Sequence, residues 1–470
     1  MDNLKIAEAS ELNRKATIAL QNGSIEEAIK GFEMAIELDP NFSQPYSNLC
    51  IAFRQSGEFE KALKCITQAI SMDPANEVAH SNMGVILADL GRIEEAVASQ
   101  SRAIDLQPNF LEPYFNRANL RVLQQRLNEA IADFDSALLL KPSYYQAKWN
   151  RALALLLTGD LQNGFEAFES RWEIPAFCSE EKFAQPMWLG KEPIFGKVIF
   201  LHSEQGLGDT LQFCRYASMI KFMGAKKVIL GVEKPLKKLM QSLDGVDQVI
   251  TRGDPLPSFD FHTPMMSLPL AFGTSLDTVP AKLSYLTADP EKVKYWSDKL
   301  GAQKMLRVGL VWSGGFRPGQ PELWEINRRR NVPLEYLAPL KIEGIEFVSL
   351  QKGADPEADL EELIQQRWNG PEMKNYVGEF EDFSDTAALI ANLDLVISVD
   401  TSTAHLAAAL GKPVWLLNRY DSCWRWLLDR SDSPWYPTLK LYRQPKMGDW
   451  DSVVESVRQD LLEVTAPLRI

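Results

Sequence analysis

The sequence predicts an α-helical solenoid followed by an α/β region of two Rossmann-like lobes. Three observations lead to this prediction. A 34-residue period runs through about the first 175 residues, the period then stops, and the remaining chain alternates short apolar segments with helical ones. A chain of 470 residues is too long for one hydrophobic core, so several domains are expected.

Small and turn-forming residues recur at 34-residue steps in the N-terminal part. The prolines are Pro40, Pro74, Pro108 and Pro142; the alanines are Ala28, Ala62, Ala96, Ala130 and Ala35, Ala69, Ala103, Ala137; the glycines are Gly23, Gly57, Gly91 and Gly159, with Gln125 in the missing place. This spacing resembles the tetratricopeptide repeat, which implies two antiparallel helices per unit. Four repeats are expected at 9–42, 43–76, 77–110 and 111–144, with a variant fifth from 145 to about 172.

Asparagine has a periodicity of its own, although it is an indifferent helix former. One repeat position holds Asn48, Asn82, Asn116 and Asn150, with Arg14 at the equivalent place in the first repeat. Either each amide bridges to a neighbouring repeat or its own turn, or the four form a ladder that binds the main chain of an extended peptide. The register resembles the superhelix of O-GlcNAc transferase and its relatives, where such a ladder holds the acceptor polypeptide. We therefore expect residues 1–175 to bind an acceptor polypeptide in their concave face.

The remaining residues alternate strands and helices, which is typical of parallel sheets. Strands are expected at 197–202, 227–232, 247–250 and 259–262 in a first series, and at 307–312, 344–351, 394–400 and 413–417 in a second. Helices of the second series are expected at 333–340, 354–366, 385–393 and 402–410. Two consecutive series suggest the bilobal GT-B arrangement, with lobes at 176–304 and 305–447. A helix in 448–470 is expected to cross back onto the first lobe.

Polar residues that follow strands are candidate ligand contacts, because ligands of open parallel sheets lie beyond the carboxyl ends of the strands. In HSEQGLGDTLQF (202–213), Gly206 and Gly208 precede or open a helix and allow close backbone approach. Asp209 is either a cap of this helix or a catalytic carboxylate.

The second lobe carries two similar motifs. In VWSGG (311–315), Ser313 and Gly314 follow a strand, and a long polar loop then ends in three arginines, of which Arg330 is favoured as a diphosphate contact. In SLQKG (349–353), Gln351 and Lys352 end a strand. Lys352 is either a phosphate contact or a surface lysine.

The stretch SVDTSTAH (398–405) is the fourth strand-end motif. Asp400 ends a strand and His405 lies in the first turn of the next helix. Between them, Thr401, Ser402 and Thr403 supply hydroxyl and N–H groups. This pattern indicates either an anion-binding nest or a well-capped helix of an ordinary α/β domain.

The combination of GLGDT, GLVWSGG, SLQKG and SVDTSTAHLAAALGKPVW resembles glycosyltransferase family 9, the heptosyltransferases, and especially the bacterial group with N-terminal tetratricopeptide repeats. The resemblance covers about residues 195–450. It implies that Asp400, Thr401 and His405 hold the diphosphate of a nucleotide-sugar donor. None of the catalytic-half motifs of O-GlcNAc transferase is present, so that enzyme's UDP-GlcNAc donor is not implied.

The same resemblance implies roles outside SVDTSTAH. It makes Asp209 the general base that deprotonates the acceptor hydroxyl. The segment DSCWRWLLDRSDSPWYP (421–437) matches as well, which places Trp424 and Arg425 at the border of the donor, with packing in the core as the alternative role for at least one tryptophan of this segment.

The predicted function is an inverting, metal-independent glycosyltransferase that acts on a protein acceptor. The nucleotide-sugar is a co-substrate, and no cofactor or metal site is expected, because the chain lacks a clear DxD motif and clustered Cys/His. Two alternatives remain: a heptosyltransferase-like enzyme acting on a glycan or lipid-linked acceptor, and a non-catalytic repeat scaffold with a degenerate GT-B domain.

Composition narrows the class of partner and the location. The net charge of −13 argues against nucleic acid as the main partner. No apolar run approaches the roughly 20 residues that span a bilayer, and the first residues do not predict a secretory signal. Five scattered cysteines without a CxxC motif predict reduced thiols and a cytoplasmic location.

Overall fold

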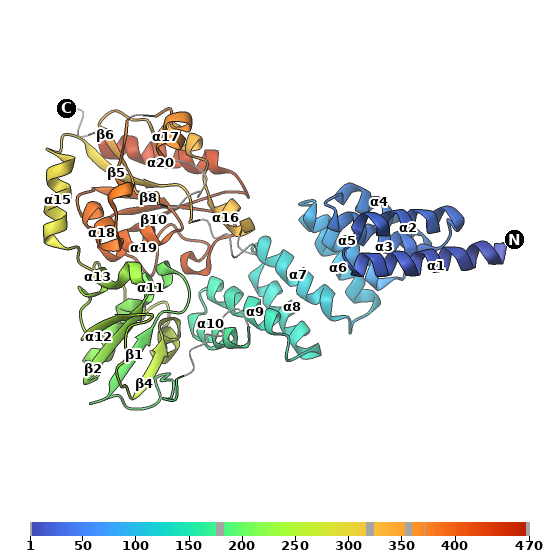
Figure 1. Cartoon of the computed structure of the whole chain (residues 1–470), viewed down its shortest axis with the longest axis horizontal. Helices are drawn as coiled ribbons and strands as arrows, with labels where there is room; N and C mark the ends of the chain where they lie inside the picture. Colours follow the sequence, from blue (N-terminus) through green and yellow to red (C-terminus); the bar gives the residue numbers. More distant parts are fainter. Residues whose placement is uncertain (1, 175–182, 316–323, 353–359, 371, 467–470) are drawn as a thin grey trace. The chain divides into compact units, whose positions relative to one another are not determined.

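The chain forms two compact units, residues 1–155 and 156–470. The computed structural model describes residues 2–174, 183–315, 324–352, 360–370 and 372–466, with the backbone alone described at 2–3, 324–326, 360–361 and 363. The first unit is helical and the second is α/β (Figure 1). The predicted fold class, a tetratricopeptide-repeat solenoid followed by a GT-B α/β region, is confirmed.

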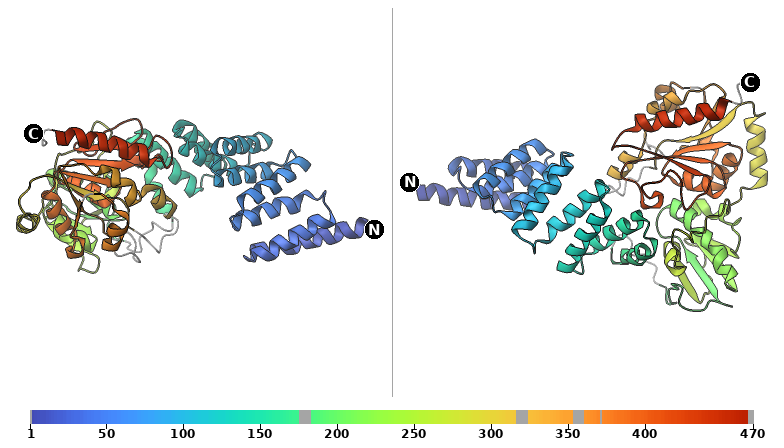
Figure 2. Two further views of the ribbon diagram at one scale, coloured as in Figure 1. Left: turned by 90° about the horizontal axis from the view of Figure 1, so that it is seen from above. Right: turned by 180° about the vertical axis from the view of Figure 1, so that it is seen from behind.

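The first unit consists of consecutive helices packed as antiparallel neighbours (Figure 2). They are α1 (Asp2–Gln21), α2 (Ile25–Leu38), α3 (Ser43–Gln55), α4 (Phe59–Met72), α5 (Glu77–Asp89), α6 (Ile93–Leu106), α7 (Leu111–Leu123), α8 (Leu127–Leu140) and α9 (Tyr145–Thr158), the last of which runs into the second unit. The even-numbered helices α2 to α8 each end two residues before a repeat proline, which cannot continue a helix.

The periodic small residues have structural roles. All eight repeat alanines are at most 2% exposed, so they allow neighbouring helices to approach closely. The periodic glycines occupy left-handed turns, with φ of +79° at Gly57 and +73° at Gly91. Gln125 takes the same conformation with φ of +60°, which costs a non-glycine residue about 1 kcal/mol.

The first lobe of the second unit is built on a four-stranded parallel sheet in the order β3-β2-β1-β4. Its strands are β1 (Val198–His202), β2 (Lys227–Val232), β3 (Gln248–Thr251) and β4 (Phe261–Pro264), which agree with all four predicted segments. The long helix expected after β1 is broken into α11 (Leu207–Phe213), η3 (Cys214–Tyr216) and α12 (Ala217–Phe222). Short helical segments η4 (Lys234–Leu236) and α13 (Lys237–Met240) follow β2, and η5 (Met265–Ser267) and α14 (Leu268–Ala271) follow β4.

The second lobe contains a six-stranded parallel sheet in the order β10-β9-β8-β5-β6-β7. The strands are β5 (Leu306–Val311), β6 (Ile345–Ser349), β7 (Met373–Asn375), β8 (Leu395–Val399), β9 (Val414–Asn418) and β10 (Leu439–Arg443). The prediction missed β7 and β10. Its helices are α17 (Leu360–Arg367), α18 (Phe383–Ala391) and α19 (Ser402–Ala409), with 3-10 turns η7 (Leu334–Leu340), η8 (Val377–Glu379) and η9 (Trp424–Trp426), and α15 (Pro290–Leu300) precedes β5.

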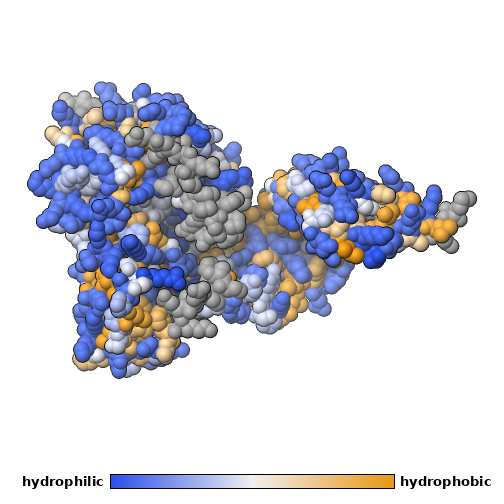
Figure 3. All heavy atoms as spheres, in the orientation of Figure 1, coloured by the Kyte–Doolittle hydropathy of each residue, from blue (hydrophilic) through white to orange (hydrophobic). Residues whose placement is uncertain are grey.

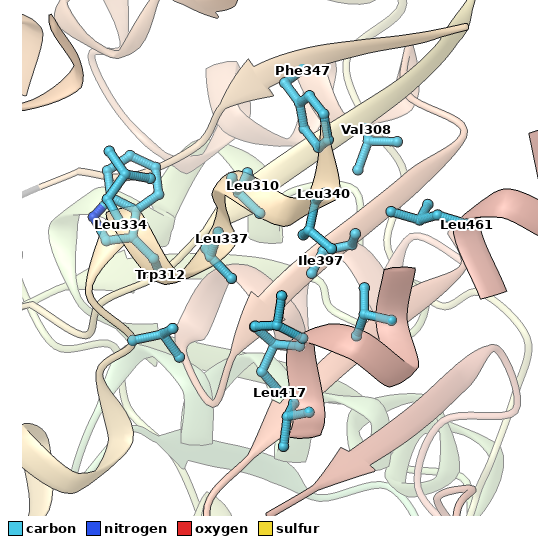
Figure 4. Packing of buried hydrophobic residues seen from close by; sticks show 14 of the residues in the cluster. Val308, Leu310, Trp312, Leu334, Leu337, Leu340, Phe347, Ile397, Leu417 and Leu461 are labelled. Carbon is cyan, nitrogen blue, oxygen red and sulfur yellow. The ribbon is translucent and has the colours of Figure 1, made fainter. Parts of the chain in front are cut away.

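The C-terminal helix α20 (Trp450–Thr465) packs on the second lobe, so the prediction that it crosses to the first lobe is wrong. Its apolar residues Val453, Val457 and Leu461 recur at helical spacing and are at most 1% exposed. They join a core with Leu337 of η7 and Ile397 of β8 (Figure 4). The lobe's own sheet and η7 therefore cover the apolar stripe of α20 completely.

The three consecutive arginines lie in a helix and not at the end of a loop, which corrects the prediction for this segment. Helix α16 (Trp324–Arg330) has Arg328, Arg329 and Arg330 in its last turn. Cations are favourable there because the carboxyl end of a helix carries partial negative charge. Most of the predicted loop, residues 316–323, and the start of the helix expected at 354 lie outside the described residues.

The boundary between the two units falls at 155/156, earlier than the predicted boundary at 175/176. Helix α10 (Leu161–Phe168) packs on α14 of the first lobe. After it, η1 (Glu169–Glu173) buries Arg171 completely, and the guanidinium bonds Glu204 at 2.7 Å and Ser267 at 2.7 Å. The end of the repeat region is thus part of the α/β unit, because a buried charge needs these partners.

The surface is mainly hydrophilic, with separate hydrophobic areas (Figure 3). Exposed apolar side chains include Phe222, 93% exposed, and Phe195, 83% exposed. Across the described ranges, no helix combines the length and the apolar character that crossing a bilayer requires. The four described cysteines are free thiols, and Cys178 lies outside the described residues.

Candidate active site

A cavity of about 760 Å³ lies between the two lobes of the α/β unit, a volume typical of small-molecule sites. Residues that follow strands make most of its lining: Gln205 to Asp209 after β1, Ser313 to Gly315 after β5, Leu350 to Lys352 after β6, Asp400 after β8 and Arg419 after β9. The amino-terminal turns of α18 and α19 and the η9 segment complete it. Because each sheet is parallel, the carboxyl ends of its strands lie along one edge. In both sheets this edge borders the cavity.

Helix α11 brings the GLGDT motif to this cavity. Gly206 is its N-cap, and the backbone N–H of Gly206 donates to Oδ2 of Asp209 at 2.8 Å. A Cβ on Gly208 would lie 3.0 Å from Cδ2 of His405 in α19. Gly208 therefore permits close contact between a first-lobe helix and a second-lobe helix, which agrees with their packing in Figure 1.

Asp209 is also paired across the lobes. Its Oδ1 accepts a hydrogen bond from Nη2 of Arg425, so both carboxylate oxygens have partners. Nε of Arg425 donates to Oε1 of Gln212 at 2.8 Å, and its guanidinium lies 4.4 Å from the Trp424 ring centroid. Burial by itself lowers the pKa of Arg425, but Asp209 and other neighbours raise it above its ordinary value. The pair is thus a half-buried ion pair between the lobes.

The SVDTSTAH residues form the second-lobe wall of the cavity. Thr401 is the N-cap of α19, and its carbonyl accepts from the N–H of Ala404 at 3.1 Å. Within the described part of the chain, the backbone N–H groups of Ser402 and Thr403 have no hydrogen-bond partner. Free N–H groups at a helix start favour an anion. This turn is therefore suited to a phosphate as well as being a helix cap.

His405 is held in place from three sides and is 4% exposed. Its Nδ1 lies 2.8 Å from the hydroxyl of Tyr436, its Nε2 lies 3.8 Å from Oδ1 of Asp400, and its ring stacks on Trp426. Burial lowers its pKa to about 4, although Asp400 acts in the opposite direction. At neutral pH the imidazole is therefore an uncharged hydrogen-bonding group.

Arg330 and Gly314 meet at the same wall. Nη1 of Arg330 donates to the backbone oxygen of Asp400 at 3.0 Å. A Cβ on Gly314 would lie 2.0 Å from Nη2 of Arg330, so only glycine leaves room for this guanidinium. The arginine thus braces the β8–α19 turn and adds positive charge beside it.

Gln351 and Lys352 differ in what they do. Gln351 is 1% exposed, accepts from the N–H groups of Trp312 and Ser313 at 3.1 and 2.8 Å, and donates to the Ser313 carbonyl at 3.0 Å. It therefore shapes the turn after β5. Lys352 is exposed, lines the cavity, and donates to the backbone oxygen of Phe380 at 2.7 Å.

Trp424 is not among the described residues that line the cavity, and its place at the donor border stays a prediction. It is 6% exposed, and its ring packs against Phe165 of α10 at 5.5 Å and Trp435 at 6.2 Å. Its indole is part of the core that joins α10 to the second lobe. Arg425, the next residue, does line the cavity.

The sequence reasoning missed several lining residues. Arg419 directly follows β9, so the rule about strand ends applied to it as well. Gln205 lies inside the quoted HSEQG motif, and its buried Nε2 has no hydrogen-bond partner among the residues that the structure describes. Asp382 is the N-cap of α18 and pairs with Lys238 of the first lobe at 3.1 Å. No sequence pattern places the start of α18 at the cavity; only the fold brings it there.

The four asparagines of the first unit fall into two groups. Nδ2 of Asn48 donates to Asn13 at 3.0 Å, and Nδ2 of Asn150 donates to Asn119 at 2.8 Å, so both bridge to the preceding repeat. For Asn82 and Asn116, both half-buried, no side-chain hydrogen bond occurs within the described ranges. At the offset of 31 residues that joins Asn150 to Asn119, the preceding repeats hold the apolar residues Ile51 and Val85. At the offset of 35 residues that joins Asn48 to Asn13, they hold Ser47 and Ser81.

Models of protein families match segments in both parts of the chain. The model of glycosyltransferase family 9 (heptosyltransferase) matches residues 354–423, and tetratricopeptide-repeat models match 12–42, 49–109 and 115–175. The chain therefore combines tetratricopeptide repeats with a glycosyltransferase family 9 domain, as predicted, and this domain supports a glycosyltransferase.

Individual relatives match parts of the chain. Protein FlbA of Caulobacter vibrioides is 27% identical over 340 residues, which are 66% of this chain and 54% of FlbA, so this chain spans about half the length of that relative. Among solved structures, MamA matches with 18% identity, 34% of this chain, 92% of its own and a TM-score of 0.32. YrrB, described as a TPR protein with an unusual peptide-binding site, matches with 18% identity, 35% of this chain, 85% of its own and a TM-score of 0.32.

Proposed function

We propose that the chain is an inverting, metal-independent glycosyltransferase that transfers a sugar from a nucleotide-sugar donor to a protein acceptor held by the repeats. The cavity carries this proposal, because it gathers SVDTSTAH, which lies within the segment matched by family 9, opposite GLGDT. It has the size of a small-molecule site and lies where ligands bind in parallel α/β folds.

The donor diphosphate fits the start of α19. The N–H groups of Ser402 and Thr403 carry the positive end of the helix dipole, and Arg330 and Arg419 lie on the same lining. Positive groups fixed at the point where the leaving diphosphate gains charge stabilise the transition state. In this proposal they replace a divalent cation, so that transfer continues in the presence of EDTA.

Asp209 is the proposed base. As the acceptor oxygen attacks the anomeric carbon, Asp209 takes the hydroxyl proton and the nucleoside diphosphate leaves from the opposite face, which inverts that carbon. Asp209 comes from the first lobe and lines the same cavity as the proposed diphosphate site. The N–H of Gly206 and the guanidinium of Arg425 already bond its two oxygens, so one of these bonds has to break before Asp209 takes a proton.

The acceptor is proposed to be a polypeptide because Asn82 and Asn116 have half-buried amides that need partners. A carboxamide both donates and accepts, and so matches the main chain of an extended peptide. Asn48 and Asn150, which bond the preceding repeat, are proposed to support the solenoid instead. A cytoplasmic location is part of this proposal.

One observation favours the alternative of a non-catalytic scaffold. Gly206 and Arg425 occupy both oxygens of Asp209, as expected for a residue that only caps a helix and joins two lobes. The scaffold and the enzyme differ in whether the cavity binds a nucleotide-sugar.

Ligand screening on the full chain separates these functions. Thermal shift with UDP-, GDP-, ADP- and CMP-sugars should reveal one donor class, because a ligand that binds only the folded state stabilises it. The absence of any response would favour the scaffold. Transfer to peptides is then followed by mass spectrometry with and without EDTA, and loss of transfer in EDTA would contradict metal independence.

The repeats are tested with two matched double variants. Asn82→Ala/Asn116→Ala should weaken binding of the best peptide from an unstructured peptide library by about tenfold, equivalent to 1.4 kcal/mol, with nucleotide affinity unchanged. Asn48→Ala/Asn150→Ala should lower the melting temperature instead, since these amides bond within the solenoid. Equal loss of peptide binding in both variants would remove the special role of the central pair.

A further inference from the structure

We propose that Arg425 is shared between Asp209 and the donor diphosphate. Donor binding withdraws the guanidinium from the Asp209 carboxylate, and the carboxylate is then free to act as a base. Arg425 is then a donor-binding residue that couples the two substrates. The inference rests on the proposed function, since it requires a diphosphate in the cavity.

The geometry around Asp209 motivates this inference. Its Oδ2 is fixed by the N–H of Gly206 at 2.8 Å, a local bond within the turn that opens α11. Its Oδ1 is held by Arg425, which comes from η9 of the other lobe. Both residues line the cavity, and their side chains are 20% and 11% exposed. Only the bond to Arg425 can be exchanged without unfolding the turn.

The other contacts of Arg425 permit such an exchange. Nη1 faces Sγ of Cys423 at 3.3 Å, and sulfur is a weak acceptor. Nε bonds Gln212, and Cζ lies over the Trp424 ring, 4.4 Å from its centroid, so one side of the guanidinium is anchored in a residue that lines the cavity. A diphosphate offers that edge stronger, bidentate acceptors.

The consequence is an order of events. With Oδ1 bonded to a cation, Asp209 has no oxygen available for an acceptor hydroxyl. When the diphosphate takes over the guanidinium, Oδ1 becomes free while Gly206 keeps the carboxylate oriented. The acceptor proton then passes to Oδ1, and deprotonation is restricted to the cavity that already holds the donor. Dead-end inhibition patterns should accordingly show donor binding first.

A thermodynamic signature follows from this competition. Removing the charge of Asp209 removes the competitor for Arg425, so Asp209→Asn should bind a nucleoside diphosphate about tenfold more tightly than the wild type while losing transfer. Arg425→Gln should bind it more weakly. The double variant should match Arg425→Gln, because the gain depends on the arginine.

The test is calorimetric titration of the full chain with UDP, GDP, ADP and CDP. The diphosphate that binds most tightly is then titrated into the wild type, Asp209→Asn, Arg425→Gln and the double variant. Glu381→Gln is the matched control, because Glu381 also lines the cavity but is 79% exposed and pairs with Lys238 instead. A gain in nucleoside diphosphate affinity that occurs in Asp209→Asn only when Arg425 is present supports the coupling. A gain that persists in the double variant, or an equal gain in Glu381→Gln, overturns it as a general charge effect.

The same variants distinguish a loss of folding from a failure of the proposed function. Circular dichroism checks each variant, and Arg425→Lys, which keeps the charge but loses the fork, replaces Arg425→Gln if that variant does not fold. Wild-type protein that is folded but binds none of the four diphosphates would remove the proposed function and the coupling with it. Binding without coupling would remove only the role of Arg425.

Discussion

At the residue scale, the turn after β5 requires a glycine at position 314, because a larger residue would collide with Arg330. A Cβ on Gly314 would overlap the Arg330 guanidinium, whereas no atom of the described residues lies within 4 Å of the Cβ position of Gly315. Gly314→Ala is expected to displace Arg330 from the Asp400 carbonyl and weaken nucleoside diphosphate binding about tenfold, measured by calorimetry. Gly315→Ala, the neighbouring control, should have a much smaller effect. Similar losses in both would show that the turn itself, and not Arg330, is critical.

His405 gives a pH prediction at the same scale. Burial lowers its pKa from 6.5 to about 4, so below pH 6.5 the unfolded state binds more protons than the folded state. This residue should therefore remove roughly 3 kcal/mol of stability between pH 7 and pH 4, an order-of-magnitude figure from 1.36 kcal/mol per pKa unit. Half-buried His202, whose pKa desolvation lowers to about 3, acts in the same direction.

The measurement compares the wild type with His405→Asn. Urea unfolding of both proteins from pH 7 to pH 4 should give a shallower loss of stability in the variant, while His202 contributes equally to both. Parallel curves would mean that the imidazole is not kept neutral by the fold.

Single residues also show where sequence reasoning succeeds. The strand-end rule placed Asp209, Arg330, Asp400 and His405 at one cavity, because parallel strands bring their carboxyl ends to a common edge. Trp424 was placed by the family resemblance and not by this rule, and a tryptophan next to a site residue looks the same in the sequence whether it faces ligand or core. The ion pair between Asp209 and Arg425, 216 residues apart, had no signal in the sequence.

At the element scale, α20 belongs to the second-lobe core. Leu461 is fully buried there and Val464, on the same helix, is 44% exposed. Leu461→Ala is expected to lower the free energy of unfolding of the α/β unit by about 2–5 kcal/mol, the usual cost of a core Leu→Ala change. Val464→Ala should stay within about 0.5 kcal/mol.

Denaturant unfolding of the full chain checks this pair. A small effect of Leu461→Ala would mean that α20 contributes little to the core. The apolar stripe of α20 predicted a helix with one buried face. It did not predict which surface covers that face, because a hydrophobic stripe is complementary to any apolar surface of similar shape.

At the scale of the whole molecule, the two compact units predict separate responses to the two substrates. The residues that line the cavity all belong to 156–470. A nucleoside diphosphate should therefore slow hydrogen exchange in 202–213 and 398–405 but not in 1–155, with a stabilisation of about 2.7 kcal/mol at 100 times Kd.

Hydrogen-exchange mass spectrometry of the full chain measures this directly. A peptide that binds the repeats should protect α3, α5 and α7 instead. Nucleotide protection spread over both units would contradict a site confined to the α/β unit.

The sequence by itself determined the repeat architecture, the two parallel α/β lobes and most strand-end residues of the cavity. These features are local or periodic: a 34-residue step, an alternation of strand and helix, and polar residues at fixed places after strands. Tertiary structure alone decided that α10 and η1 join the α/β unit, that α20 stays on the second lobe, and that Arg425 holds Asp209. Each of these depends on contacts between residues distant in the chain, where burial and charge pairing act through shape that no local pattern encodes.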